Sequence, residues 1–243
     1  MKKDILIIAA AFMIFFSCKN MMNNPFSSIK GEGAVEKFTR DVNGFKGVEV
    51  SEAADVSIRQ GAEFKVLIEA QKNIADLLET TVENGVLKIY FKKGTGSVSY
   101  DKLHIYVQAP DFDKLKLSGS GNLETESALT GQSLDLILSG SGDAKIKELN
   151  YSNVVATVTG SGNININGGS SEKIEYEVSG SGDIDSKGLK AKDVVAHVTG
   201  SGNINCSAET TLDASVTGSG DIYYAGTPSV KSRITGSGSI EKK

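Results

Sequence analysis

The sequence is poor in the residues that support several common kinds of protein chemistry. Its 243 residues include no Trp and only 3 Pro, 2 Cys and 2 His. So few histidines and cysteines, far apart in the chain, do not make a ligand set for a transition metal. No cofactor-binding motif is present. The formal net charge is −4, and no basic stripe runs along the chain, which argues against nucleic acid as a partner.

The sequence also lacks an apolar run long enough to span a bilayer. Ile5–Phe16 has 12 residues, whereas a spanning helix needs about 20. The run follows Lys2 and Lys3 and ends just before Cys18, an order that resembles a bacterial lipoprotein signal. The resemblance implies a signal peptide over residues 1–17, a lipidated Cys18, and a tether over residues 18–34. The alternative is an ordinary secretory signal in which Cys18 is a chance thiol.

What the sequence has in abundance is a repeat. Gly-Ser-Gly occurs seven times, with its first glycine at positions 119, 140, 160, 180, 200, 218 and 236. Successive copies are about 20 residues apart, so the copies mark one repeated structural unit. Two residues before each first glycine stands an aliphatic residue, and apolar and polar positions alternate upstream of it. This period of two predicts one buried face per strand.

Each unit therefore reads as a strand of about six residues, a Gly-Ser-Gly corner, a short strand and a variable loop. Such units bury their apolar face only when they stack. We predict an all-β fold, a single-stranded parallel β-helix (β-solenoid) with about 20 residues per coil. Glycine suits the corner because it reaches positive φ without steric cost and lets successive coils approach closely.

The residue after each corner alternates between Asn and Asp. The column reads Asn122, Asp143, Asn163, Asp183, Asn203, Asp221 and Ser239. In coils of about 20 residues, neighbours in this column lie about 4.8 Å apart, so alternation places an amide between carboxylates that would otherwise repel. A coil of about 40 residues would instead stack acid on acid, which is destabilising and needs a cation.

Residues 35–112 lack the Gly-Ser-Gly corners but keep the alternation of strands. Asn84-Gly85 is a hairpin-type turn signal, and residues 73–78 could form one helical turn. We interpret residues 35–112 as less regular opening coils and residues 113–243 as repeat coils of one solenoid. The alternative is a separate small β-domain at the N-terminal end.

These features resemble the head GIN domain family, whose members are auto-transporter adhesins and are common as lipoproteins of Bacteroidota. The resemblance rests on the Gly-Ser-Gly-Asn/Asp units preceded by Val-Thr or Val-Ser, and on the opening "GFKGVEVSEAADVSIRQG". It covers about residues 35–243 and implies a β-helix of pectin-lyase-like shape without recognised catalytic residues. It also implies an adhesive role at the bacterial outer membrane, with the protein facing either the periplasm or the exterior.

Catalysis finds little support in the residues. A Ser-His-acid site would have to use His104 or His197, and His197 stands at an outward position of a repeat strand. Glu175, Glu177, Asp183 and Asp185 lie within two strands of one unit and could form an acidic patch. Carbohydrate-cleaving enzymes work through such carboxylates, so an enzyme using this outer face is the alternative to a non-catalytic binding module.

Three further sets of residues can be interpreted either structurally or functionally. Asp143, Asp183 and Asp221 are weak calcium candidates, because oxygen ligands suit Ca²⁺, although alternate copies carry Asn. Cys206 shares a column with aliphatic residues and is predicted to be a buried hydrophobe. Tyr224 is predicted to point inward and Tyr223 to be exposed.

The function predicted from the sequence is a lipid-anchored binding module, an adhesin whose partner is a glycan or another envelope or surface protein. Long, repetitive solenoid faces suit extended ligands of this kind. No cap is evident after the last corner, which makes end-to-end association of two copies a further hypothesis.

Overall fold

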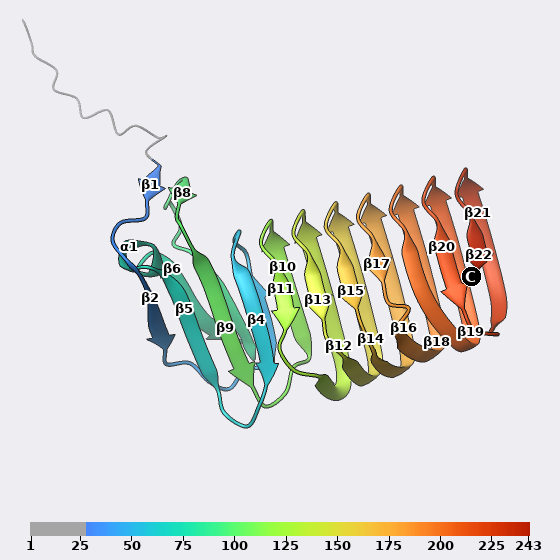
Figure 1. The fold of residues 1–243 in the computed structure, drawn as a ribbon, viewed down its shortest axis with the longest axis horizontal. Helices are drawn as coiled ribbons and strands as arrows, with labels where there is room; N and C mark the ends of the chain where they lie inside the picture. Colours follow the sequence, from blue (N-terminus) through green and yellow to red (C-terminus); the bar gives the residue numbers. More distant parts are fainter. Residues whose placement is uncertain (1–27) are drawn as a thin grey trace, which may run out of the picture.

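Two stacks of β-strands lie on opposite sides of one apolar core in the computed structural model, which describes residues 28–243 (Figure 1). In the repeat half of the chain, sheet I contains the long strands that end at the corner glycines. Sheet II contains the short strands that follow the corners. Successive coils stack along the long axis of the molecule, and the C-terminal coil ends the stack (Figure 1).

The repeat region alternates between the two sheets. In sheet I lie β10 (Lys114–Gly119), β12 (Leu129–Gly140), β14 (Leu149–Gly160), β16 (Gly169–Gly180), β18 (Leu189–Gly200) and β21 (Ser229–Gly236). In sheet II lie β11 (Leu123–Thr125), β13 (Ala144–Ile146), β15 (Ile164–Ile166), β17 (Ile184–Asp185), β20 (Ile222–Ala225) and β22 (Ile240–Lys242). The remaining strand, β19 (Ile204–Gly218), begins in sheet II and ends in sheet I.

The strand register confirms the predicted coil length. Gly140 pairs with Gly160, and Gly160 with Gly180, in parallel strands. Consecutive units in the sequence are therefore consecutive coils in space, about 20 residues apart. The fold is the predicted β-solenoid, and the alternative of a coil twice as long is wrong.

The variable loop predicted within each unit is wrong for most coils, because those residues are extended and paired. In β14, residues 149–151 pair with both neighbouring coils, as do residues 153–160. Position 152 between them is unpaired, and the buried positions change parity there: Leu149 and Tyr151 face the core, and so do Val154 and Ala156. The strand bends at this point and gives the coil a third side.

The corner glycines are required by the approach of neighbouring coils. The carbonyl oxygen of Gly140 accepts hydrogen bonds from the N–H groups of Ser161 and Gly162 in the next coil, at 2.9 and 3.1 Å. Gly160 has φ +121°, and a Cβ there would lie 2.4 Å from the oxygen of Gly140. A Cβ on Gly162 would lie 2.0 Å from the oxygen of Gly142. Only glycine fits at both positions, as predicted.

The N-terminal region has a different order. Its elements are β1 (Ile29–Lys30), β2 (Val35–Arg40), β3 (Gly47–Val50), β4 (Asp55–Gln60), β5 (Lys65–Gln71), α1 (Lys72–Ala75), β6 (Leu78–Glu83), β7 (Val86–Phe91), β8 (Val98–Ser99) and β9 (Leu103–Ala109). The strands β3 and β4 pair in parallel with β10 and β11, and so form the coil next to the repeats. The next coil outward is made of β7 and β9, which come later in the chain.

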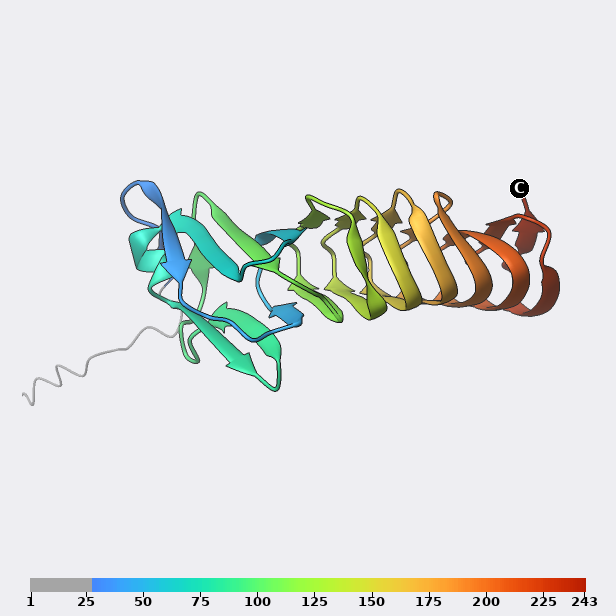
Figure 2. The ribbon, with the colours of Figure 1, turned by 90° about the horizontal axis from the view of Figure 1, so that it is seen from below.

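Antiparallel strands close this end of the stack. In sheet I, β6 pairs with β7 through the turn at Asn84 and Gly85, which have φ +52° and +76°. In sheet II, β5 pairs with both β9 and β2. Figure 2 shows this end as broader than the repeat stack. The predicted hairpin and the helical turn are confirmed, but opening coils alone do not describe residues 35–112, because β2, β5 and β6 form an antiparallel cap.

The core is one continuous set of aliphatic columns. The inward positions before and after the corners, such as Val158 and Ile164, are buried, and so is Cys206, whose pKa burial raises to about 12. Tyr224 packs partly against the core as predicted. Tyr223 is half-buried rather than exposed, because Lys243 lies over its ring and its hydroxyl donates to Asp221.

Cys18, the predicted lipidation site, lies outside the described residues. In residues 28–243 no helix has the length and apolarity to cross a membrane.

Candidate ligand-binding face

The predicted acidic patch is divided between the two sheets. Tyr176 and Ile184 are buried, so Glu175 and Glu177 point outward from sheet I, and Asp185 points outward from sheet II. Asp185 lies 3.5 Å from Lys187, its partner in an exposed ion pair. Because the core separates the two sheets, the structure does not gather these carboxylates in one groove.

Asp143, Asp183 and Asp221 form part of a hydrogen-bonded ladder along the corner. Asn163 donates through its backbone N–H and its Nδ2 to Oδ1 of Asp143, at 3.0 and 2.8 Å. The backbone N–H of Asp183 donates in turn to Oδ1 of Asn163, at 3.1 Å. The alternation of Asn and Asp is explained by this pattern, as predicted.

The ladder also keeps the three calcium candidates two coils apart. Oδ1 of Asp183 accepts two bonds from Asn203, at 2.7 and 2.9 Å, so it is already used by the ladder. In the part of the chain that the structure describes, no three His, Cys, Asp or Glu side chains converge as metal ligands would. The structure therefore brings no two of the three aspartates to a common site.

Each histidine is hydrogen-bonded to a serine on a neighbouring strand. His197 Nδ1 lies 2.7 Å from Ser215 Oγ on the outer face of sheet I. His104 Nε2 lies 2.8 Å from Ser57 Oγ on sheet II, and Ser57 Oγ is 3.4 Å from Glu124 Oε1. The Ser57 side chain is covered, with 3% exposure. Between residues 28 and 243 no carboxylate bonds to the other nitrogen of His104, so the Ser57–His104 pair lacks the orienting acid of a catalytic triad.

His104 and Ser57 lie at the boundary between two hollows on the outer surface of sheet II. The first, here called the histidine hollow, measures about 260 Å³ and is lined by Asp55, His104, Glu124, Asp143 and Lys145, among others. Burial lowers the pKa of His104 below its usual 6.5. The imidazole at this wall is therefore neutral at neutral pH.

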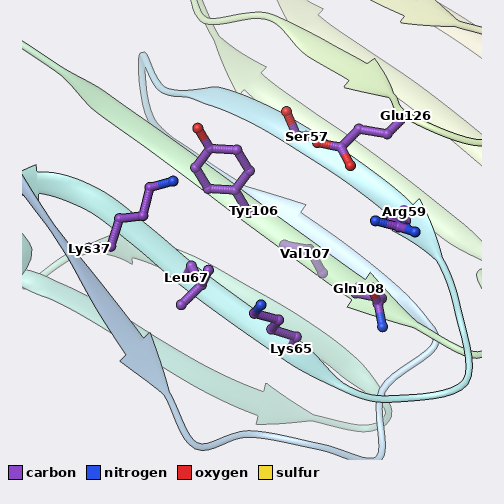
Figure 3. A pocket seen from close by; sticks show the side chains of 9 residues that line it. All are labelled: Lys37, Ser57, Arg59, Lys65, Leu67, Tyr106, Val107, Gln108 and Glu126. Atoms are coloured by element: carbon purple, nitrogen blue, oxygen red, sulfur yellow. The ribbon is translucent and has the colours of Figure 1, made fainter.

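The second hollow, here called the cationic hollow, measures about 140 Å³. Figure 3 shows its lining side chains, which come from β2, β4, β5, β9 and the segment after β11. They are Lys37, Ser57, Arg59, Lys65, Leu67, Tyr106, Val107, Gln108 and Glu126. Three cations and one carboxylate thus surround the Tyr106 ring and the Leu67 side chain, whereas the Val107 side chain is buried in the core.

Tyr106 is the most firmly held side chain of the cationic hollow. Its hydroxyl donates to Glu69 Oε2 at 2.8 Å, which raises the pKa of Tyr106 to about 12. The same hydrogen bond, together with Lys102, lowers the pKa of Glu69. The rings of His104 and Tyr106 stack with centroids 4.2 Å apart, and Lys37 Nζ lies 5.0 Å from the Tyr106 ring centroid. The ring is therefore fixed before any ligand arrives.

Sequence reasoning did not find the cationic hollow. Its cations lie on strands that are not repeated, and β9 inserts between β4 and β5 in space although it follows both in the chain. No spacing in the sequence indicates that Arg59 and Lys65 lie on either side of Gln108, next to Tyr106 on β9. The one available signal was the alternation in "LHIYVQAP", which places His104, Tyr106 and Gln108 on the same face of a strand.

A family model described as "Putative auto-transporter adhesin, head GIN domain" matches residues 44–228. The chain belongs to the head GIN domain family. The match spans every strand of the two hollows except β2, as well as six of the seven corners. The family resemblance expected from the repeats is thereby confirmed.

Solved structures of proteins from Bacteroidales share the head GIN fold. A "putative adhesin" from Bacteroides fragilis superposes with a TM-score of 0.83 at 24% identity, covering 88% of this chain and 100% of its own. At this level of identity the likeness shows the fold. Among curated proteins, none matches the sequence.

Two structures from Parabacteroides distasonis are slightly closer in sequence. One, a "putative adhesin", has 27% identity and a TM-score of 0.72, covering 89% of this chain and 100% of its own. The other, a "putative lipid binding protein", has 26% identity and the same TM-score, covering 89% of this chain and 99% of its own. Proteins of similar fold thus carry different functional descriptions, so function has to be argued from the side chains of this chain.

Proposed function

We propose that this head GIN protein is a non-catalytic adhesion module that binds a glycan on the outer surface of sheet II. The observation that carries the proposal is the cationic hollow, which combines a fixed aromatic ring with polar side chains of both signs. Binding sites for small ligands have this make-up, with an apolar surface and a few oriented polar groups. An adhesin needs to hold its partner and not to transform it.

The repeat region gives this site a rigid support. Each coil adds about 4.8 Å along the axis, so the coils after the hollows form a stiff, extended body. Its outer faces are long and regular in backbone and offer contacts to a long ligand such as a polysaccharide or to another surface protein. We infer that the hollows supply selectivity and that the repeat faces supply length.

The proposal includes a lipid anchor at Cys18 and a location at the bacterial outer membrane, on either its periplasmic or its outer side. It rests on the lipoprotein-like order of residues 1–18. Labelled fatty acid should be incorporated into the wild-type chain and not into Cys18→Ser. Equal labelling of both chains would disprove the anchor.

The exposed apolar side chains of the last coil support a second copy of the chain as a partner. Val230 and Ile234 occupy inward columns of β21, yet they are 40% and 46% exposed. Contact between two such ends would cover these side chains and pair the open strand edges. Light scattering should detect a dimer that Ile234→Lys disrupts. A monomer at high concentration would refute this partner.

One experiment separates the binding module from the carbohydrate-active enzyme. The chain without residues 1–18 is applied to a glycan array, and released reducing sugar is measured on each bound glycan. The proposal expects binding without release. Release that disappears in Glu177→Gln would establish the enzyme instead, and binding to no glycan would remove glycan recognition.

A further inference from the structure

We propose that the cationic hollow recognises the carboxylate of an acidic sugar, with the sugar ring packed beside Tyr106. This inference rests on the proposed glycan-binding function and names the class of glycan. It also names the side chains that select it: Arg59, Lys37 and Lys65 for the carboxylate, and Gln108 and Glu126 for the hydroxyl groups.

The first argument is a local excess of positive charge. Lys37, Arg59 and Lys65 come from three different strands and converge on the hollow (Figure 3). In residues 28–243 none of the three forms an ion pair within 4.0 Å, whereas Lys102, on the same sheet, pairs with Glu69. Lys37 lies opposite Glu69 in the pairing of β2 with β5, and Glu126 lines the hollow, but the three cations of the lining outnumber its one carboxylate. On a chain whose net charge is −4, this local excess creates a positive potential that a concave surface concentrates.

The second argument is the geometry of the charged groups. The planar guanidinium of Arg59 offers paired N–H donors that match the two oxygens of a carboxylate. Lys65 and Arg59 lie on either side of Gln108 across β9, and Lys37 lies farther from Arg59, beyond Tyr106 and Leu67 (Figure 3). A carboxylate bound by Arg59 would therefore leave the rest of its sugar over the apolar surface.

The third argument favours a sugar over another anion. Glu126 lines the same hollow as the three cations, and its negative charge disfavours a doubly charged phosphate or a ligand with two carboxylates more than a ligand with a single carboxylate. It would instead accept hydrogen bonds from sugar hydroxyls, as would the side-chain oxygen of Gln108, whose Nε2 donates to the Glu63 carbonyl at 3.2 Å. An acidic peptide brings negative charge without hydroxyl donors for Glu126, so an acidic sugar satisfies more of the lining.

The aromatic ring completes the match. Sugar rings present C–H groups on one face, and aromatic side chains bury such apolar surface while tolerating polar neighbours. Tyr106 is held by Glu69 and stacked on His104, so its position costs no further ordering on binding. A hollow of about 140 Å³ suits one terminal or side-branch sugar unit better than a long buried segment.

The test uses the whole mature chain and pairs of oligosaccharides that differ only in a carboxylate. Suitable pairs are oligogalacturonate with its carboxyl-reduced form, and sialylated with desialylated glycans. We expect the acidic member of at least one pair to bind about tenfold more tightly or better, the effect of a charge-assisted hydrogen bond. Arg59→Gln should abolish the difference, and Lys190→Gln, which removes an exposed cation outside the hollow, should preserve it.

The outcomes distinguish this inference from the function on which it rests. Equal binding of acidic and neutral members would overturn the acidic-sugar inference and leave glycan binding intact. Binding to no glycan would overturn both. Equal binding of poly-glutamate and acidic glycans, lost in Arg59→Gln and Lys190→Gln alike, would indicate non-specific attraction of anions. Thermal melting of each variant checks that the fold is retained.

Discussion

The repeat region and the N-terminal region use the same ladder of backbone hydrogen bonds but arrange the chain in opposite ways. In the repeats, each coil pairs with the next coil along the chain, and apolar side chains return in each inward column. In the N-terminal region, β9 lies between β4 and β5, and β3 lies between β7 and β10. The difference teaches that coils stacked in chain order build a regular core and a rigid support. Strands whose order in the sheet differs from their order in the chain bring unlike side chains together, as a binding site requires.

Glycines offer the largest contrast between the two regions. Gly162→Ala would place a Cβ 2.0 Å from the Gly142 oxygen, and backbone would have to move in both coils. In Gly85→Ala, in the cap hairpin, the added Cβ would meet no atom within 4 Å, and the only cost is that alanine must adopt a φ of +76°. We expect a loss of about 3 kcal/mol or more for Gly162→Ala and of about 1 kcal/mol for Gly85→Ala, measured by urea unfolding.

The exposed Ser161, beside Gly162, provides the control for this comparison. Ser161→Ala changes the same corner without approaching the preceding coil, and we expect its unfolding free energy to stay within about 0.5 kcal/mol of the wild type. If Gly162→Ala were as mild as Ser161→Ala, close stacking would not be the reason for the repeated glycines.

A second contrast concerns the Asn/Asp ladder, which the repeat region uses throughout. Asn163→Asp would remove the amide that donates to Asp143 at 2.8 Å and would set three carboxylates in succession. We expect a loss of about 2 kcal/mol at pH 7. Like charges raise the pKa of carboxyl groups in the folded state, so the penalty should appear as pH rises through that raised pKa and vanish below about pH 4.

The matched control for the ladder is Asn153→Asp on β14. It makes the same chemical change at an exposed position, opposite Ser133 in one neighbouring coil and Lys173 in the other. Unfolding free energies measured between pH 4 and pH 7 should show the acid-reversed penalty for Asn163→Asp alone. A similar pH dependence in both variants would mean that added negative charge, rather than the ladder, causes the loss.

The same contrast explains how far the sequence could be interpreted. The coil length, the buried columns, the corner glycines and the amide ladder all followed from spacing, because each unit meets a near copy of itself. The bend at Ser152 was visible only as a change in the parity of apolar positions and was missed. The cationic hollow depends on strand pairings between segments such as residues 35–40 and 65–71, whose partnership no local pattern encodes.

The smallest expected effect belongs to the N-terminal region and tests its half-buried histidine. Burial lowers the pKa of His104 from its usual 6.5, against the attraction of Asp55, Glu69 and Glu124 and together with the repulsion of Lys102. The folded state therefore binds fewer protons than the unfolded state just below pH 6.5, and stability falls as pH decreases through this range.

The free energy of unfolding of the wild type should therefore decrease when the pH is lowered from 7.5 to 5.5. In His104→Gln we expect this decrease to be smaller, by up to about 1 kcal/mol.

His197 makes this prediction a comparison between the two regions. It too is bonded to a serine across strands, at 2.7 Å from Ser215, but it lies in the repeats. His197→Gln retains His104 and should therefore keep the acid-dependent loss of the wild type, while His104→Gln should not. If both variants, or neither, reduced the loss, the acid sensitivity would not arise at the wall between the two hollows. A loss specific to His104 would show that the site-bearing region, and not the repeat stack, responds to acid.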